Sequence, residues 1–428
     1  MPFAALDLHR SVVEALIIDD QGAPLHSSRF DATREALLAF AKRHLTPQHQ
    51  LVIEATTNTW AVAALLDRFV GRLVVSNPLR TKAIAGAKIK TDKVDVRVLA
   101  ELLRCDYLPE VWKPDPATRQ LRAATTERSC LTSDRTRIKN RIHAILHQRL
   151  IPAPADLFSA KSRAWLEKLP LDDFGRNALN RQLRLLDDIE TELVEVTDSL
   201  AGKAHGDPKI KLLMTLPGCD FTVAQALLAA LGDISRFPDA DAAASYLGLT
   251  PSTYQSADKC YHGRITKQGR SHARWMMVEA AQFLGRNTGP LGVFFRRIAK
   301  RKGRNVAVVA AARKLVTIAW HMLKNNEPYR YAQPSTIECK FDRLRVRVTK
   351  EKKKGGLPKG SPRPENYGKG RTRAVPALSA VYAANGLPPV QTPRPGEQAM
   401  LDCNGLARLR ETIETPRRTT KAPNKAKA

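Results

Sequence analysis

The chain has few cysteines, and their spacing fits no cysteine-based site. Its six cysteines are scattered over 428 residues without a CxxC pair or a Cys/His cluster. Zinc sites and disulfide frameworks both require cysteines that are grouped or regularly spaced. We therefore expect neither, and we expect a protein of a reducing compartment.

The sequence also lacks a clear membrane-directing segment. Its first 20 residues have no basic stretch ahead of their apolar run, unlike a secretory signal peptide. The longest apolar stretch, residues 306–323, is interrupted by Arg313 and Lys314. This predicts a buried helix of a soluble domain rather than a membrane span. We expect a cytoplasmic protein without a membrane partner.

Acidic residues are scarce in the C-terminal half. The formal net charge of +28 divides into +1, +3, +11 and +13 over residues 1–110, 111–205, 206–330 and 331–428. Contacts with phosphates release counterions and dominate nucleic-acid affinity, so this asymmetry favours a nucleic-acid partner. A merely solubilising basic surface is the weaker alternative.

The first quarter of the chain has the pattern of an α/β domain. Alternating and apolar runs predict a mixed sheet flanked by helices. The expected strands are 3–8, 11–18, 25–31, 50–54 and 72–76. Helices are expected at 33–44, at 58–69 and from Asp92 onward. A basic loop containing Lys82, Lys88 and Lys90 should precede the last of these helices.

The rest of the chain is expected to be mainly helical. A basic helix over 117–150 and an acidic one over about 175–200 predict an antiparallel hairpin with complementary charge, a face for RNA or DNA, or both. Two helices around Pro217 and Gly218, a polar loop at 248–269, helices at 270–284 and 306–324, and a disordered basic tail from 331 should follow. The expected domains are 1–110, 111–205, 206–330 and 331–428.

Four acids form the most informative pattern. Asp7 and Glu54 end two predicted strands, and Asp92 and Asp95 begin a helix that Thr91 is placed to cap. At 100° per residue the last two share the apolar side of that helix, where carboxylates need donors or a cation. Each acid alone has an ordinary explanation as a turn residue or a cap. Together they favour Mg²⁺ or Mn²⁺, and a pair of such ions can promote phosphodiester chemistry.

A second group of residues combines hydroxyls and cations. Within residues 248–274 the hydroxyls are Ser252, Thr253, Tyr254 and Ser256, and the cations are Lys259, Arg264, Lys267, Arg270 and Arg274 beside His262. A hydroxyl that attacks a phosphate needs such cations to neutralise the developing charge. From the residues alone, a basic loop that grips phosphates without chemistry is favoured, and no single hydroxyl stands out.

Several stretches resemble the DEDD-type insertion-sequence transposases. These recombinases join a RuvC-like (RNase H-fold) domain to a serine-bearing C-terminal domain. The matching stretches fall in the family's order over about residues 1–330, and KTDKVDVRVLA and LGLTPSTYQS are the most diagnostic. The others are ALDLH, VIEAT, NPLRTKAIAGAKI, LMTLPG, ALLAALGDISRF and AARKLVTIAWHMLKNNEPY.

The resemblance implies a site as well as a fold. It implies that Asp7, Glu54, Asp92 and Asp95 are the catalytic, metal-binding DEDD set and that Ser256 is the nucleophile. It also implies a RuvC-like domain, a helical hairpin and a mainly α C-terminal domain with a helix-hairpin-helix-like element. Arg264, Lys267, Arg270 and Arg274 are expected to contact nucleic acid from their position alone.

The resemblance further implies the partners. Members of the family join element and target DNA under the guidance of a structured bridge RNA. They act as homo-oligomers, here expected to be a dimer or tetramer, in which the serine of one subunit completes the acidic site of another. Such a protein would associate with the nucleoid.

The chain departs from the family in three places. Ala5-Leu6 precede Asp7, Cys219-Asp220 follow the Pro-Gly turn, and the tail beyond 331 is long. Two rival functions are a metal-dependent junction nuclease with water as nucleophile, and a non-catalytic nucleic-acid-binding protein.

Overall fold

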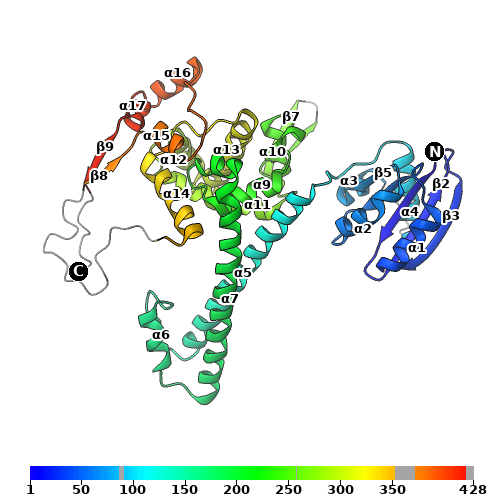
Figure 1. The fold of residues 1–428 in the computed structure, drawn as a ribbon, viewed down its shortest axis with the longest axis horizontal. Coiled ribbons are helices and arrows are strands. Elements are labelled where there is room, and N and C mark those ends of the chain that lie inside the picture. The colour runs from blue at the N-terminus through cyan, green and yellow to red at the C-terminus, as the bar shows by residue number, and fades with distance from the viewer. Residues whose placement is uncertain (86–90, 257, 352–371, 421–428) are drawn as a thin grey trace. The chain divides into compact units, whose positions relative to one another are not determined.

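The computed structural model describes residues 1–85, 91–256, 258–351 and 372–420 (Figure 1). It forms two compact units, Met1–Asp115 and Pro116–Ala428. The finer limits expected at residues 205 and 330 stay a prediction.

The first unit is built on a five-stranded mixed sheet of order β3-β2-β1-β4-β5 (Figure 1). Strand β1 is antiparallel to β2 and parallel to β4, which is parallel to β5, and β2 is antiparallel to β3. The strands are β1 Phe3–Leu8, β2 Val12–Ile18, β3 Pro24–Asp31, β4 Gln50–Glu54 and β5 Arg72–Ser76. The mixed sheet is confirmed, whereas its RuvC-like identity stays a prediction.

Helices cover both faces of this sheet. Helices α1 (Arg34–His44) and α2 (Thr59–Leu66), the latter continued by the 3-10 turn η1 (Asp67–Phe69), pack on one face. Helix α4 (Asp92–Arg104) packs on the other through Val96, Leu99, Ala100 and Leu103. The expected amphipathic helix is therefore present.

The segment before α4 differs from its prediction. Helix α3 (Pro78–Ile84) replaces the expected loop at Lys82, because the Asn77 side chain accepts from the backbone N–H groups of Leu79 and Arg80 and Pro78 suits the first turn. Lys88 and Lys90 lie outside the described residues. As predicted, the Thr91 hydroxyl accepts from the backbone N–H of Val94 and caps α4.

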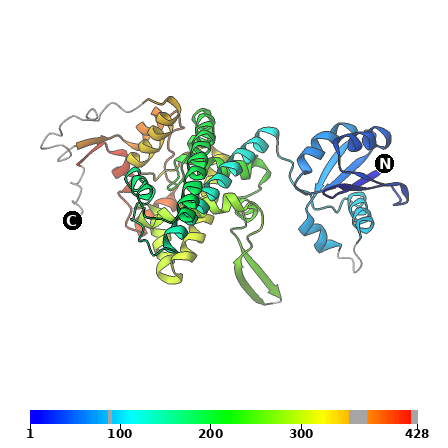
Figure 2. The same cartoon turned by 90° about the horizontal axis from the view of Figure 1, so that it is seen from below.

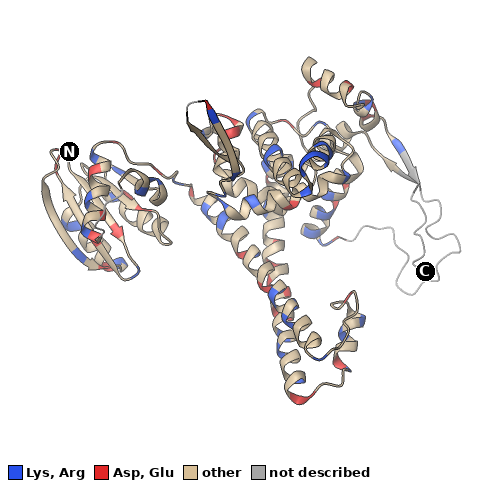
Figure 3. Cartoon of the chain, turned by 180° about the vertical axis from the view of Figure 1, so that it is seen from behind, with Lys and Arg blue, Asp and Glu red and all other residues tan. Residues whose placement is uncertain are grey.

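The second unit begins with the expected antiparallel helical hairpin. Helices α5 (Pro116–His147) and α7 (Asp173–Gly206) pack along each other, with α6 (Ala160–Glu167) between them in the chain (Figure 1). Both signs of charge lie along the hairpin (Figure 3), and Lys139 pairs with Glu190 across it at 3.2 Å. The complementary-charge interpretation is supported, and a nucleic-acid role of the same helices stays a prediction.

A large helical core follows the hairpin. It contains α8 (Pro208–Met214), α9 (Phe221–Leu231), α10 (Ala240–Tyr246), α11 (Ser271–Gln282), α12 (Pro290–Lys302) and α13 (Arg304–Asn325), with the 3-10 turns η2 (Ile234–Arg236) and η3 (Phe283–Arg286). Of these helices, α10 and α12 were not predicted from the sequence.

The Pro-Gly turn between α8 and α9 requires its glycine. Gly218 has a φ of +75°, and a Cβ there would lie 2.2 Å from the carbonyl oxygen of Ala280. Asp220 caps α9 by accepting from the backbone N–H of Val223 at 2.9 Å. The Asp220 carboxylate thus already takes up one of the N-terminal donors of α9. The helix-hairpin-helix-like element stays a prediction.

Helix α13 is the one helix of the described part that is long and apolar enough to cross a membrane. Nine of its residues are buried, and they belong to the helical core. The expected buried helix is therefore present in the apolar stretch.

The expected polar loop at 248–269 contains a hairpin instead. Strand β6 (Pro251–Ser256) pairs antiparallel with β7 (Lys259–Ile265), and the hairpin projects from the helices of its unit (Figure 2). Most of its residues are exposed, and the apolar alternation that signals a half-buried strand is missing from their sequence.

The prediction of a disordered tail from residue 331 is wrong for the described part of that tail. Residues 352–371 and 421–428 lie outside the description. The tail contains α14 (Pro334–Thr349), α15 (Leu378–Ala384), α16 (Pro395–Cys403), α17 (Leu409–Glu414) and the paired strands β8 (Thr372–Val375) and β9 (Arg417–Thr420).

Apolar residues spaced by one helical turn explain why α14 is a packed helix and not a disordered segment. Ile337, Phe341 and Leu344 are buried in the helical core despite the many cations around them. The Lys340 ammonium donates to the carbonyl oxygens of Met214 and Leu216, at 2.8 and 2.6 Å. The high basic content of the tail therefore concealed an amphipathic helix.

We predict that Phe341→Ala lowers the free energy of unfolding of the second unit by about 3–5 kcal/mol, because it leaves a cavity in the core. Urea denaturation measures this change. Arg343→Ala, at an exposed position of the same helix, should change it by less than about 0.5 kcal/mol. Equal small effects of both variants would show that α14 does not pack on the core.

Candidate functional site

Asp7 and Glu54 lie at the carboxyl ends of neighbouring parallel strands. The β1–β4 register ends at the pair Leu6 and Ile53, so these acids come next on the two strands. Side chains alternate along a strand, which places both acids on the sheet face that carries Ala5 and Val52. Helix α4 covers that face and brings its own acids toward the same sheet edge.

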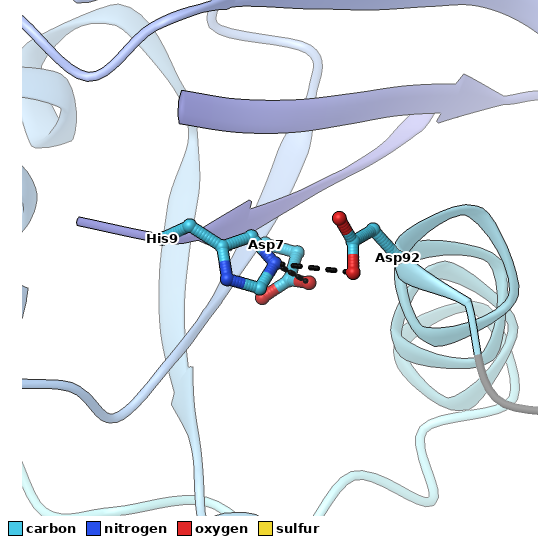
Figure 4. Close-up of side chains that lie close together, drawn as sticks. All are labelled: Asp7, His9 and Asp92. Carbon is cyan, nitrogen blue, oxygen red and sulfur yellow. Dashed lines mark hydrogen bonds and ion pairs between the residues drawn. The ribbon is translucent and has the colours of Figure 1, made fainter. Parts of the chain in front are cut away.

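The first turn of α4 brings Asp92 to Asp7 (Figure 4). His9 lies between them, with its Nε2 3.1 Å from Asp7 Oδ2 and 3.3 Å from Asp92 Oδ1. The ligand atoms of the three residues lie within 4.8 Å of one another. Residues far apart in the sequence thus form one cluster of possible metal ligands.

Burial and neighbouring charges both act on the pKa of Asp7. Its side chain is buried, and burial raises the pKa of Asp7 above its ordinary value. His9 acts in the opposite direction, while the negative charges of Asp92 and Asp95 raise the pKa of Asp7 further. Asp95 therefore acts on Asp7 as well. Carboxylates that disfavour one another's ionised form are stabilised when a cation lies between them.

The donor set fits a divalent cation. Asp7 and Asp92 offer hard carboxylate oxygens close together, and a divalent ion would relieve the charge repulsion at Asp7. The His9 imidazole occupies the position between the two acids and is itself a possible nitrogen ligand, which Mn²⁺ accepts more readily than Mg²⁺.

Two residues were not predicted from the sequence, one in this cluster and one beside it. One is His9, and the other is Glu14, which is 4% exposed and lies directly opposite Asp7 in the β1–β2 register. Alternation places Glu14 on the same sheet face as Leu16 and Ile18, the face covered by α4. A glutamate inside the apolar strand VVEALII was the signal that marks it.

Ser256 lies in the second unit, at the last position of β6 and opposite Lys259. Its side chain is exposed and makes no hydrogen bond with any described residue. A serine hydroxyl is a weak nucleophile until a base or a metal ion activates it. Within the described part of its own unit, Ser256 has no such group in hydrogen-bond contact.

Two other hydroxyls of the hairpin, unlike that of Ser256, have hydrogen-bond partners. Thr253 Oγ1 lies 3.1 Å from His262 Nδ1, and the Ser252 hydroxyl donates to the carbonyl oxygen of Arg264 at 3.2 Å. Thr253 is therefore the hydroxyl with an imidazole partner. The geometry alone does not single out Ser256, whose role rests on the family resemblance.

Two exposed tyrosines share the hairpin face of Ser256. Tyr254 and Tyr261 are opposite each other in the register, with exposed fractions of 71% and 65%. Exposed aromatic rings are surfaces on which nucleobases stack. The face that presents the serine hydroxyl therefore also suits nucleic acid.

The four predicted phosphate contacts fall into two classes. Arg264 and Lys267 are exposed and have no ion-pair partner among the described residues. Arg274 donates to the carbonyl oxygens of Leu247 and Gln268, at 3.0 and 3.2 Å, and so fastens the base of the hairpin.

Arg270 belongs to the same class as Arg274, because its side chain also has a partner within the unit, the side chain of Tyr246. Burial raises the pKa of Tyr246. The hydrogen bond between Tyr246 and Arg270 has the opposite effect, as do the positive charges of Arg122, Arg236 and Arg270. Together they outweigh burial, so that the pKa of Tyr246 is lowered. Arg270 thus contributes to a positively charged site at the foot of the hairpin. Its contact with nucleic acid stays a prediction, as do those of the other three cations.

Comparisons with known proteins connect both units to one kind of enzyme. A family model described as a DEDD transposase of the IS110 type matches residues 4–151. A second, described as the transposase IS116/IS110/IS902 family, matches residues 210–291. Together the two matches cover more than half of the chain.

Several relatives carry corresponding names. The transposase for insertion sequence element IS1111A of Coxiella burnetii is 24% identical over 56% of this chain and 68% of its own length. An uncharacterised 44.8 kDa protein of insertion element IS116 of Streptomyces clavuligerus is 23% identical over 75% of this chain and 94% of its own. The pilin gene-inverting protein of Moraxella bovis is 26% identical, with coverages of 68% and 84%.

We predict that Asp7→Asn and Asp92→Asn each weaken Mn²⁺ binding by about ten-fold or more, because each removes an oxygen ligand from the cluster. Isothermal titration calorimetry without nucleic acid measures this binding. The control, Asp31→Asn, alters an exposed carboxylate at the end of β3 and should leave the affinity unchanged. The same small change in all three variants would mean that the ion binds elsewhere.

Proposed function

Because the chain belongs to the DEDD-type insertion-sequence transposases and so acts as a DNA transposase or recombinase, we propose that it cuts and rejoins DNA through Ser256 and a metal-binding DEDD set. The observation that carries the proposal is the convergence of Asp92 and Asp95 on the buried Asp7. Such a cluster favours a cation at the point where two strand ends meet a helix start.

We propose Asp7, Glu54, Asp92 and Asp95 as the metal ligands, with Mg²⁺ as the ion and Mn²⁺ as its substitute. A bound divalent ion would polarise the scissile phosphate and stabilise charge on the leaving oxygen. His9 would then give up its position between Asp7 and Asp92 or join the ligands. Glu14 would add negative charge from the neighbouring strand.

Ser256 would supply the nucleophile. Its Oγ forms a bond to the phosphorus as the bond from that phosphorus to one strand oxygen breaks. The serine proton leaves, and the departing oxygen takes up a proton. The DNA is then covalently joined to the protein, and attack by another strand oxygen reverses the step and frees the serine. Arg264, Lys267, Arg270 and Arg274 would neutralise phosphate charge during these steps.

The site would be divided between subunits of a dimer or tetramer. This proposal is supported by the exposure of Ser256 and by its lack of a hydrogen-bonded base in the described part of its unit. A serine from one subunit that approaches the acids of another would receive its activation there.

Both element DNA and target DNA would be selected with a structured bridge RNA. The strongly basic second half of the chain and the basic helix α5 support contacts with more than one nucleic acid. The exposed tyrosines of the hairpin suit unpaired bases. We expect the protein in the cytoplasm, associated with the nucleoid.

One rival keeps a specific observation in its favour. In a metal-dependent junction nuclease, water attacks the phosphate, and an exposed serine without a base would be incidental. The remaining rival, a non-catalytic binding protein, does not agree with the family assignment.

We predict a covalent protein–DNA adduct when the protein is incubated with nicked or junction DNA, Mg²⁺ and the RNA transcribed from the element's flank. Denaturing gel electrophoresis with labelled DNA detects it. Ser256→Ala and Asp92→Ala should each abolish the adduct, since one removes the nucleophile and the other a metal ligand.

The matched control is Thr253→Ala, which removes the neighbouring hydroxyl that pairs with His262. It should retain the adduct. Loss of the adduct in Thr253→Ala but not in Ser256→Ala would make Thr253 the nucleophile. Cleavage of the DNA without any adduct would support the junction nuclease. Unchanged adduct formation without RNA would refute guidance by RNA.

A further inference from the structure

A cavity of about 590 Å³ in the second unit has no part in the proposed chemistry. Helices α12 and α13, residues 327–331 and helix α16 of the C-terminal tail line it. Leu291, Phe294, Ile318 and Met322 form apolar parts of its wall. Its size lies within the range of cavities that bind small organic ligands.

The two acids of this cavity share one arginine. Arg330 pairs with Glu327 at 2.9 Å and also with Glu397, which accepts a hydrogen bond from the Tyr331 hydroxyl at 2.6 Å. This network joins α16 to the segment after α13. One arginine balances one of the two carboxylates, so the network keeps a single negative charge to set against the other cations of the wall.

Three further cations line the cavity. Arg297, Lys314 and Arg394 are exposed and have no ion-pair partner among the residues described. His321 lies among them: burial lowers the pKa of His321, and the charges of Lys314, Lys324 and Arg394 lower it further. The cavity therefore combines surplus positive charge with a neutral imidazole and apolar surface.

We propose that this cavity binds one unpaired nucleotide, with its phosphate on Arg297, Lys314 and Arg394 and its base against Phe294, Ile318 and Met322. Guanidinium groups suit phosphate, and bases stack on aromatic and arginine side chains. The side chains of Asn325 and Asn404 can hydrogen-bond the edge of a base.

A paired base cannot enter such a cavity, so the ligand is a strand end, an extruded nucleotide or a free nucleotide. The inference uses only the nucleic-acid partner of the enzyme and does not depend on Ser256 as nucleophile. Since α16 supplies part of the wall, it also gives the C-terminal tail a role in binding.

Fluorescence anisotropy of the full-length protein tests the proposal. The probes are labelled, 5′-phosphorylated tetranucleotides of DNA and of RNA, with unlabelled AMP as competitor. Arg297→Ala and Lys314→Ala should each weaken binding of at least one tetranucleotide about ten-fold, which corresponds to ~1.4 kcal/mol. AMP should displace the probe if a free nucleotide suffices.

The matched control is Lys300→Ala, which removes an exposed cation of α12 that does not line the cavity. It should change the affinity by less than about two-fold. Both cavity variants and the control should bind a blunt DNA duplex as the unaltered protein does. Unchanged melting temperatures verify that the variants fold.

An equal loss in Lys300→Ala and in the two cavity variants would overturn the proposal, because it would reveal general attraction to a basic surface. Failure of the unaltered protein to bind either tetranucleotide would overturn it too. Adduct formation is measured separately, so absence of an adduct together with specific tetranucleotide binding would reject Ser256 chemistry and retain the nucleotide site.

Discussion

A buried carboxylate surrounded by other carboxylates is unfavourable unless a positive charge lies among them. The first unit creates this situation at Asp7 through its topology. Parallel pairing of β1 with β4 sets Asp7 beside Glu54, antiparallel pairing with β2 sets Glu14 opposite, and packing of α4 adds Asp92 and Asp95. The His9 imidazole lies between Asp7 and Asp92. A divalent cation would balance the negative charge, and the proposed phosphodiester chemistry depends on that ion.

The second unit contributes features that the acids cannot supply. It presents a serine and two tyrosines on one face of an exposed hairpin, and it carries most of the surplus positive charge. Its C-terminal tail is part of the folded unit, because α14 packs in the core and α16 forms part of the wall of a positively charged cavity. The proposed nucleotide site and the proposed reaction site therefore use different residues of the chain.

Much of the first unit could be predicted because its strands are apolar and its helices carry clear signals. The Thr91 cap and the apolar stripe of Val96, Leu99 and Leu103 predicted helix α4, and therefore also placed Asp92 in its first turn. The hairpin of Ser256 escaped prediction since both its faces are exposed. Helix α14 escaped because charged residues separate Ile337, Phe341 and Leu344. The contact of His9 with two acids depends on tertiary packing and was not visible in the sequence. The role of Ser256 came from resemblance to a family rather than from its surroundings.

Mixing two inactive variants tests the central claim most directly, because the claim divides one site between subunits. Asp92→Ala retains the serine, and Ser256→Ala retains the acids. We predict that neither variant alone forms the DNA adduct, that a mixture of the two restores it, and that the DNA is attached to the Asp92→Ala subunit. A mixture that assembles into oligomers on DNA and RNA but forms no adduct, under conditions in which the unaltered protein does, would contradict the account.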